Sequence, residues 1–413
     1  MSHGHGHGHA HGDAPDLRLS RTARTATMVL LAVVAALTLA GLVWLWPGER
    51  PMNDGSSLTA AGIDPVRARI VSIQPCPDNE GAPDPTQPGG LEHACSIARV
   101  LIEEGPSAGS QADVDLIGVT AASGLTVGDP LQVAQVPDAD GSPGDWALIT
   151  VDRMPVLIGF IIAFVLAVLA VAGRKGFFGL LGLVVSGAVL FGFLIPSLTS
   201  GHPAVPVAIV GSTAIMFVVL YLAHGVSWRT TSAFVGTWLS LLVTTGLGAL
   251  GVALARLSGV SSEETVALAG VLGGLDFPDI LTCSLVIAGL GVLNDVTITQ
   301  ASSVWEIRAA GPGLSRRELF TSGMRIGRDH IASTIYTIVF AYAGASLSLL
   351  LLLSLYEQPL HILLSTEQFS EEIIRTLGSG IGLVLSVPLT TGVAALTVAG
   401  TAAARTAPRR AVV

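Results

Sequence analysis

Charge is scarce in this sequence of 413 residues. Only 12% of the residues are Asp, Glu, Lys or Arg, whereas 50% are hydrophobic. The basic residues stand singly or in short groups beside apolar runs, unlike the continuous basic surface of a nucleic-acid-binding protein, so no nucleic-acid partner is expected. The sequence also lacks GxSxG, phosphate-loop and HExxH motifs, and we therefore do not expect an enzyme.

Long apolar runs take the place of charge. A helix needs about 20 apolar residues to cross a hydrocarbon core of about 30 Å. The 48 glycines suit helices that pack closely in a lipid bilayer. We therefore predict a mainly α, polytopic membrane protein with about eight transmembrane helices. The eight runs are Met28–Trp46, Met154–Ala172, Phe177–Ile195, Ala204–Ala223, Ser232–Leu257, Ile280–Thr299, Ile331–Leu355 and Leu377–Ala402.

The basic residues of the short loops indicate how these helices are oriented. Lys and Arg are enriched in cytoplasmic loops, and nearly all of them fall on one side if both termini are cytoplasmic. Arg256 and Arg375 are the exceptions. We expect a multi-pass protein of the bacterial cytoplasmic membrane. The inside group is Arg18, Arg21, Arg24, Arg174, Lys175, Arg229, Arg308, Arg316, Arg317, Arg325, Arg328, Arg405, Arg409 and Arg410.

This orientation divides the chain into five parts. The first span ends in Trp44–Leu45–Trp46 and has no clean small-residue cleavage site, so we interpret it as a retained anchor rather than a signal peptide. The predicted parts are a disordered His-rich cytoplasmic tail (1–27), the first transmembrane helix (28–46), an extracytoplasmic β domain (47–153), a seven-helix membrane domain (154–404) and a basic cytoplasmic tail (405–413).

Residues 47–153 differ in character from the apolar runs. Short β-type runs alternate with Pro, Gly and Asp clusters that are typical of turns. Five such strands in about 100 residues predict a small β-barrel-like domain of OB type. We interpret it as a docking or gating module without chemistry; a ligand-binding barrel is the alternative. The runs are Val66–Gln74, Ser96–Glu104, Ala112–Gly118, Leu131–Val136 and Trp146–Val151.

Cysteine is nearly absent, with three residues in the chain. Cys76 and Cys95 both fall in the predicted outer domain and flank a Pro/Gly-rich loop. Because the outer side of the membrane is oxidising, we predict a disulfide between them. Closing a loop of that size stabilises the domain by about 3 kcal/mol in the chain-entropy estimate. A metal pair with His93 is the alternative, and Cys283 in span six is interpreted as a small packing residue.

The N-terminal segment MSHGHGHGHAHGD carries His3, His5, His7, His9 and His11 at alternating positions. Interleaved with Gly, these imidazoles form a flexible multidentate ligand suited to a divalent metal such as Zn²⁺. The segment resembles the cytosolic His-rich stretches of several metal transporters. Three interpretations stay open: buffering or sensing of a transported ion, low-complexity drift with incidental metal affinity, and an expression artefact.

Asp295 is the most informative single residue, because a carboxylate at the centre of a membrane helix costs at least about 2.5 kcal/mol. It lies at the end of span six, and Thr299, Ser302 and Glu306 follow at helical spacing on one face. At 1.5 Å per residue, Asp295 comes close to the inner boundary. Two interpretations follow: a cation or proton site, or a boundary carboxylate paired with a loop arginine.

Further acidic residues stand at helix starts. Asp276 and Asp279 flank a proline at the outer end of span six, and Asp329 and His330 open span seven. A carboxylate at a helix N-terminus is favoured by the helix dipole, so simple capping is one interpretation. A proton relay or cation site is the other, since His titrates near neutral pH.

Small and polar residues form a narrow face on the last span. Ser379, Gly382, Ser386 and Thr390 fall three to four residues apart on an otherwise apolar helix. Pro388 in the same span should kink the helix. Kinked helices near the midplane are where transporters place substrate groups, and ordinary packing through small residues is the alternative. A similar set in span five, Gly236, Ser240 and Thr244, is interpreted as packing.

Four of these segments resemble the YibE/F-like family of bacterial multi-spanning membrane proteins. The motifs are GGLDFPDIL, LNDVTITQASSVWEIR, SGMRIGRDHIASTIYTIVFAYAGASL and IRTLGSGIGLVLSVPLTT, within roughly residues 155–402. The resemblance implies that Asp295 matches the acidic position of the family in span six, and that Gly327–Arg328–Asp329 match its GRD motif. Many relatives carry a second Asp where this chain has Asn294. The resemblance implies the membrane architecture rather than an activity.

Two functional hypotheses follow. The first is a permease or transporter with a polar path between spans six, seven and eight, Asp295 and Asp329 as cation or proton sites and His330 as a proton partner. A divalent metal, coupled to protons, is the first substrate expected. The second is a non-transporting envelope scaffold or signalling protein whose outer domain docks a protein partner. A homo-oligomer is compatible with both.

Overall fold

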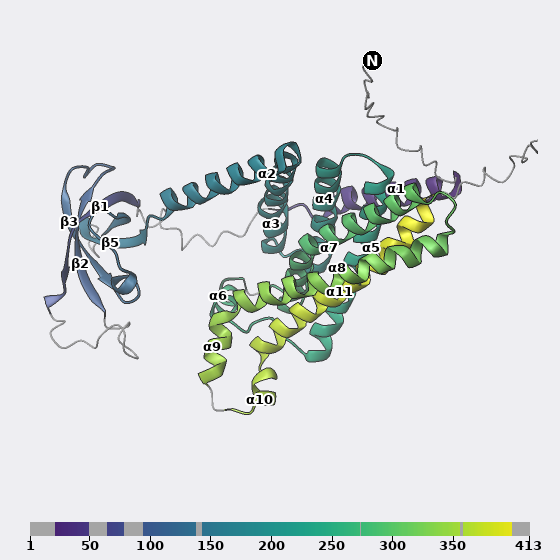
Figure 1. Cartoon of the computed structure of the whole chain (residues 1–413). Helices are drawn as coiled ribbons and strands as arrows, with labels where there is room; N and C mark the ends of the chain where they lie inside the picture. The colour runs from purple at the N-terminus through teal and green to yellow at the C-terminus, as the bar shows by residue number, and fades with distance from the viewer. Residues whose placement is uncertain are drawn as a thin grey trace, which may run out of the picture. The chain divides into compact units, whose positions relative to one another are not determined.

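The computed structural model describes residues 21–48, 64–77, 94–137, 143–272, 274–355 and 358–398. They divide into two compact units (Figure 1), Pro51–Val171 and the remainder of the chain. The predicted metal ligands His3, His5, His7, His9 and His11, the alternative ligand His93 and the C-terminal basic tail lie outside the described residues. We describe each unit by itself.

The smaller unit holds a five-stranded antiparallel sheet in the order β3-β2-β1-β4-β5. β3 also lies against β5, so the sheet is a nearly closed barrel. With a 3-10 turn between β3 and β4, this order is that of an OB-type barrel. The predicted five-stranded domain is thereby confirmed as barrel-like. The strands are β1 Val66–Pro75, β2 Cys95–Ile102, β3 Gln111–Ile117, β4 Pro130–Pro137 and β5 Pro143–Val151.

Alternation along the strands produces the barrel interior. One buried residue from each of four strands points into the barrel: Ile70, Val100, Leu116 and Leu131. The residues directly before and after each of them on its strand are polar or at least partly exposed. Cys76 bonds to Cys95 at the start of β2, with 5.6 Å between the Cα atoms. The predicted disulfide is therefore confirmed.

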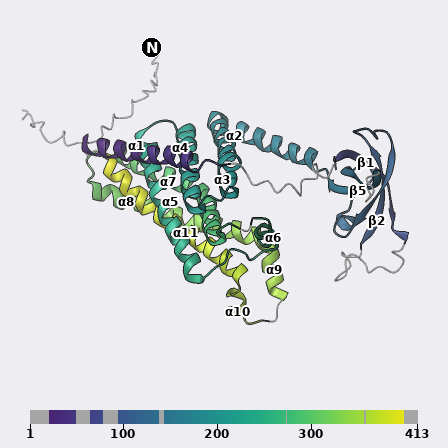
Figure 2. The ribbon, with the colours of Figure 1, turned by 180° about the vertical axis from the view of Figure 1, so that it is seen from behind.

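The larger unit is helical. Its helices, with α2 shared between the two units, are α1 Arg21–Trp44, α2 Met154–Val189, α3 Ile195–Thr199, α4 Ala204–His224, α5 Trp228–Ala255, α6 Glu263–Val271, α7 Phe277–Ala310, α8 Arg316–Ala345, α9 Leu347–Leu355, α10 Leu360–Leu364 and α11 Glu367–Thr397. A π-helical turn, η3, covers Leu190–Leu194 between α2 and α3. In both views (Figure 1, Figure 2) α5, α7, α8 and α11 lie side by side, as their contacts also show.

Among the described residues, six helices are long and apolar enough to cross a membrane. This establishes a multi-pass membrane protein, whereas the predicted count of eight is not reproduced. Predicted spans two and three join in a single helical stretch of 46 residues, Met154–Thr199. The stretch is broken at Gly173, whose φ of 53° and ψ of −130° are not helical; glycine adopts this conformation without the steric cost of a side chain.

Predicted span seven differs for another reason. Its helix, α8, begins at Arg316 because Ser315 and Glu318 form a capping box there, so its first half is charged. The helix ends at Ala345, and the apolar residues that follow belong to the nine-residue α9. α8 has the length of a span but not the hydropathy, and α9 is too short, whereas Ile331–Leu355, from the second half of α8 to the end of α9, was predicted as one span.

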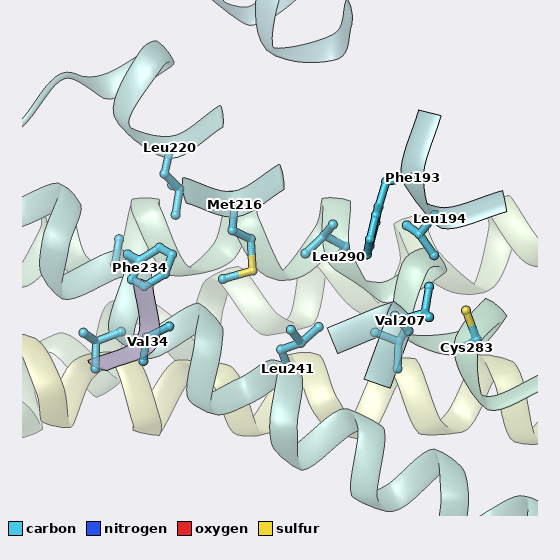
Figure 3. Close-up of a cluster of buried hydrophobic side chains, with 14 of the residues drawn as sticks. Val34, Phe193, Leu194, Val207, Met216, Leu220, Phe234, Leu241, Cys283 and Leu290 are labelled. Atoms are coloured by element: carbon cyan, nitrogen blue, oxygen red, sulfur yellow. The ribbon is translucent and has the colours of Figure 1, made fainter. Parts of the chain in front are cut away.

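The core of the larger unit lies where α1, η3, α4, α5 and α7 meet (Figure 3). Phe193, Met216, Phe234 and Leu290 come from four of these elements and are at most 8% exposed. Cys283 joins the same cluster as a buried free thiol, consistent with its interpretation as a packing residue. This core holds the helices that carry the polar residues described next.

Candidate functional site: a buried polar seam

The acidic face predicted on span six is present on α7, and its side chains are exposed at the surface of the helical unit. Asp295, Thr299 and Glu306 are exposed, while the intervening Thr297 and Gln300 are buried against α5, α8 and α11. Glu306 forms an ion pair with Arg229 of α5, with 3.1 Å between Oε1 and Nη1. The predicted residues thus share a face, as their spacing indicated, but that face is not the one that packs against α5 and α11.

The surroundings of Asp295 are charged. Its carboxylate, the ammonium of Lys175 and the guanidinium of Arg229 all act electrostatically on the imidazole of His224, at the end of α4. Within the described part of the chain Asp295 has no hydrogen bond or ion pair. Its carboxylate therefore has no partner in the described residues that holds it in place.

The other predicted acidic residues lie at the start of α7 and in the middle of α8, so the helix start predicted at Asp329 and its capping role there are wrong: α8 already begins at Arg316. Asp276 caps α7 by accepting a hydrogen bond from the backbone of Asp279, at 3.1 Å, in agreement with the capping interpretation. Asp329 is exposed on α8, and the half-buried His330 has an Nε2 atom with no partner in the described residues. No three His, Cys, Asp or Glu side chains among the described residues lie close enough to hold a metal ion.

The interior between α5, α7 and α11 carries polar residues without charge. We call this set the polar seam. Each of its side chains is at most 4% exposed. The polar seam comprises Ser232, Thr237, Ser240, Thr244, Thr297, Gln300, Ser386, Thr390, Thr391 and Thr397. Of the last-span face predicted as a path, Ser386 and Thr390 belong to the polar seam, and the Ser386 hydroxyl donates to the backbone oxygen of Leu383 at 2.7 Å.

Side-chain hydrogen bonds join the helices along the seam. The Thr237 hydroxyl of α5 bonds to that of Thr297 on α7, and Ser232 of α5 bonds to Thr397 of α11 at 2.9 Å. Gln300 Nε2 donates both to the backbone oxygen of Gly323 on α8, at 2.9 Å, and to Thr391 Oγ1 on α11, at 2.7 Å. Gln300 therefore ties three helices together, although sequence reasoning did not single it out.

α5 and α11 approach each other through reciprocal contacts of glycine and threonine. A Cβ at Gly236 of α5 would overlap Thr390 of α11, and a Cβ at Gly382 of α11 would overlap Thr244 of α5. The lower-numbered residue of each helix thus faces the higher-numbered residue of the other, so the two helices run antiparallel. Ser240 and Ser386 lie halfway between these contacts, at the centre of the arrangement.

The reciprocal contacts follow from an internal repeat. Residues 229–250, RTTSAFVGTWLSLLVTTGLGAL, align without gaps with residues 375–396, RTLGSGIGLVLSVPLTTGVAAL, and 10 of the 22 positions are identical. The shared residues include the Gly, Ser and Thr of the contacts. This repeat is a sequence signal that the prediction of separate polar faces on spans five and eight missed.

Fold, hydropathy and seam define the class: a multi-pass membrane protein with an inner seam of hydroxyl and amide side chains. The sequence profile of the YibE/F-like proteins matches residues 160–400, more than half of the chain, so the chain belongs to that family. The match covers the whole seam and leaves the β barrel outside. No curated protein and no solved structure matches the chain.

Proposed function

We propose that this protein is a membrane permease whose substrate passes along the polar seam. The observation that carries the proposal is the antiparallel pairing of the two repeated helices, α5 and α11. Sequence repeats of opposite direction in the membrane are typical of secondary transporters, which place the substrate near the midplane at the repeat interface. Under the predicted orientation, α5 runs outward and α11 returns inward, as such an inverted repeat requires.

The seam has the chemistry of a path that opens and closes. Most of its hydroxyl groups donate a hydrogen bond to a backbone oxygen of their own helix, as Thr244 does to Ser240 and Thr391 does to Val387. Such bonds survive when helices move apart. The hydroxyl of Thr390 in the seam, and that of the buried Ser379 nearer the start of α11, have no partner among the described residues, so they are free to bond a substrate or water in an open state.

The proposed substrate is a cation, with proton coupling, and a divalent metal is tested first. Asp295 supports this part of the proposal, because it is a carboxylate without a fixed partner near the predicted inner end of α7 and beside His224. A His–Asp neighbourhood suits proton exchange near neutral pH. Asp329 and His330 are proposed as a second acidic site on α8.

Flux into proteoliposomes tests the proposal. Purified protein is reconstituted, and uptake of a panel of divalent ions is followed beside a pH-sensitive dye. We expect Asp295→Asn to lower the flux roughly tenfold or more, equivalent to about 1.4 kcal/mol or more in the limiting step. Glu306→Gln is the matched control, because Glu306 lies on the same helix face and has its own ion pair with Arg229. Equal fluxes in the two variants would contradict the assignment of Asp295.

A scaffold or signalling role is the second candidate. The β barrel is a compact unit of its own and lies outside the family match, so it is the part that a partner specific to this chain would contact. Deletion of residues 60–150 discriminates the two roles in cells. A scaffold loses its phenotype with the barrel, whereas a permease whose barrel only docks retains flux in proteoliposomes.

A further inference from the structure

A cavity of about 480 Å³ lies within the larger unit, beside the seam. The second part of α2, the π-helical turn η3, α4 and α7 form its walls. Its lining is almost entirely aliphatic, with Leu190, Ile215, Met216 and Leu290 among the residues. No ionisable side chain lines it, so a charged ligand would be buried there without a counter-ion, which is strongly unfavourable.

Two polar atoms in the walls lack hydrogen-bond partners. Ser212 of α4 is fully buried, and its hydroxyl has no partner among the described residues; the same holds for the buried side-chain oxygen Oδ1 of Asn294 on α7. Both residues line the cavity. Buried polar atoms are nearly always hydrogen-bonded, and each that is not costs about 1–3 kcal/mol.

The backbone keeps the cavity open. Gly187 of α2 and Gly291 of α7 both line it, and a Cβ built on either residue meets no atom within 4 Å. The adjoining π-helical turn Leu190–Leu194 also contributes to the wall, and such turns occur frequently at functional sites. Two helices thus carry glycine at the cavity wall, where an added side chain would meet no neighbouring atom at its Cβ.

We infer that this cavity binds a neutral amphiphile, with a hydroxyl head between Ser212 and Asn294 and an aliphatic chain along the apolar wall. A hydroxyl can donate to Asn294 Oδ1 or accept from Ser212 Oγ, so a hydroxyl head has a partner of either kind in the wall. The aliphatic lining buries the chain. This site is separate from the proposed cation path, and its test does not require transport.

Photolabelling tests the site. The full-length protein in lipid nanodiscs is labelled with a decanol that carries a diazirine in its chain, and labelled peptides are located by mass spectrometry. We expect labels on the cavity walls in α4 and α7, with competition by unlabelled decanol and by a diacylglycerol in the nanodisc if a lipid is the natural source. Decane and decyl ammonium should compete far less.

Two glycine-to-leucine variants distinguish labelling inside the cavity from labelling through general contact with lipid. Gly291→Leu fills the cavity and should abolish the labelling of α4 and α7. Gly179→Leu is the matched control, because a Cβ at Gly179 also meets no atom within 4 Å and this residue does not line the cavity. Ser212→Ala combined with Asn294→Leu should weaken competition by decanol roughly fivefold or more, as expected for lost hydrogen bonds. Equal labelling in both glycine variants, or equal competition by decane and decanol, would overturn the inference.

Discussion

Individual polar residues in this protein have opposite surroundings depending on which face of one helix they occupy. On α7, Asp295 and Thr299 are exposed, whereas Thr297 and Gln300 are buried and hydrogen-bonded. The spacing of Asp295, Thr299 and Glu306 correctly predicted a shared face. It could not predict that the face points outward, because the position of the neighbouring helices decides that.

Gln300 is the residue whose replacement we expect to cost most stability among the polar residues of α7. Gln300→Leu removes two hydrogen bonds that join α7 to α8 and α11, at a cost of roughly 1–3 kcal/mol. The melting temperature of the purified protein should fall accordingly. Thr299→Ala, one residue away and exposed, should leave it unchanged. A Gln300→Leu protein as stable as the wild type would contradict a structural role for these bonds.

Asp113 on the barrel provides a pH test at the same scale. The guanidinium of Arg99 donates two hydrogen bonds to its carboxylate, at 2.8 and 3.0 Å, and lowers the pKa of Asp113. Because the pKa of Asp113 is lower in the folded state than in the unfolded state, the ionised carboxylate stabilises the fold at neutral pH. This stabilisation is lost as the pH falls through the folded-state pKa. Hydrogen exchange of β2 and β3 should therefore be slower in wild type than in Asp113→Asn at pH 7. The difference should vanish in acid; a difference that persists there would contradict the pairing.

At the scale of elements, strands and most helices follow from local sequence. Alternating residues and turn clusters predicted all five strands. Apolar runs predicted α4, α5 and α7 with shifts of a few residues at their ends, except that α7 continues to Ala310. Single residues decide the remaining differences. Glycine at 173 puts a kink between two helical parts of one stretch, at the place where spans two and three were predicted to separate, and the capping box at Ser315 starts a helix in what was predicted to be a loop.

The α5–α11 pair gives the sharpest prediction for an element. Gly236→Leu places a side chain where Thr390 already lies, so the two helices must separate. We expect loss of folded protein in detergent, seen as aggregation on size-exclusion chromatography and a lowered melting temperature. Gly246→Leu is the control on the same helix, because a Cβ there meets no atom within 4 Å. Similar behaviour of both variants would contradict the close packing of α5 on α11.

At the scale of the whole molecule, the internal repeat relates two helices that the span-by-span prediction treated as unrelated. The sequence contains it in full, since 10 of 22 positions are identical between residues 229–250 and 375–396. Prediction by individual spans treats each polar face alone and assigns one to packing and the other to a path. The structure brings the two together in one antiparallel pair, so the packing face and the path face are the same seam.

The central claim, that substrate passes along a seam that opens between α5 and α11, is tested most directly by locking that seam. Ser240→Cys and Ser386→Cys, introduced together with Cys283→Ser, place one thiol at the centre of each helix. Flux into proteoliposomes is then measured before oxidation, after it, and after mild reduction, with the single Ser240→Cys protein as control. We predict that cross-linking stops flux and reduction restores it, while the control is unaffected. Undiminished flux through the cross-linked protein, or no flux through the unlocked one, would contradict the account.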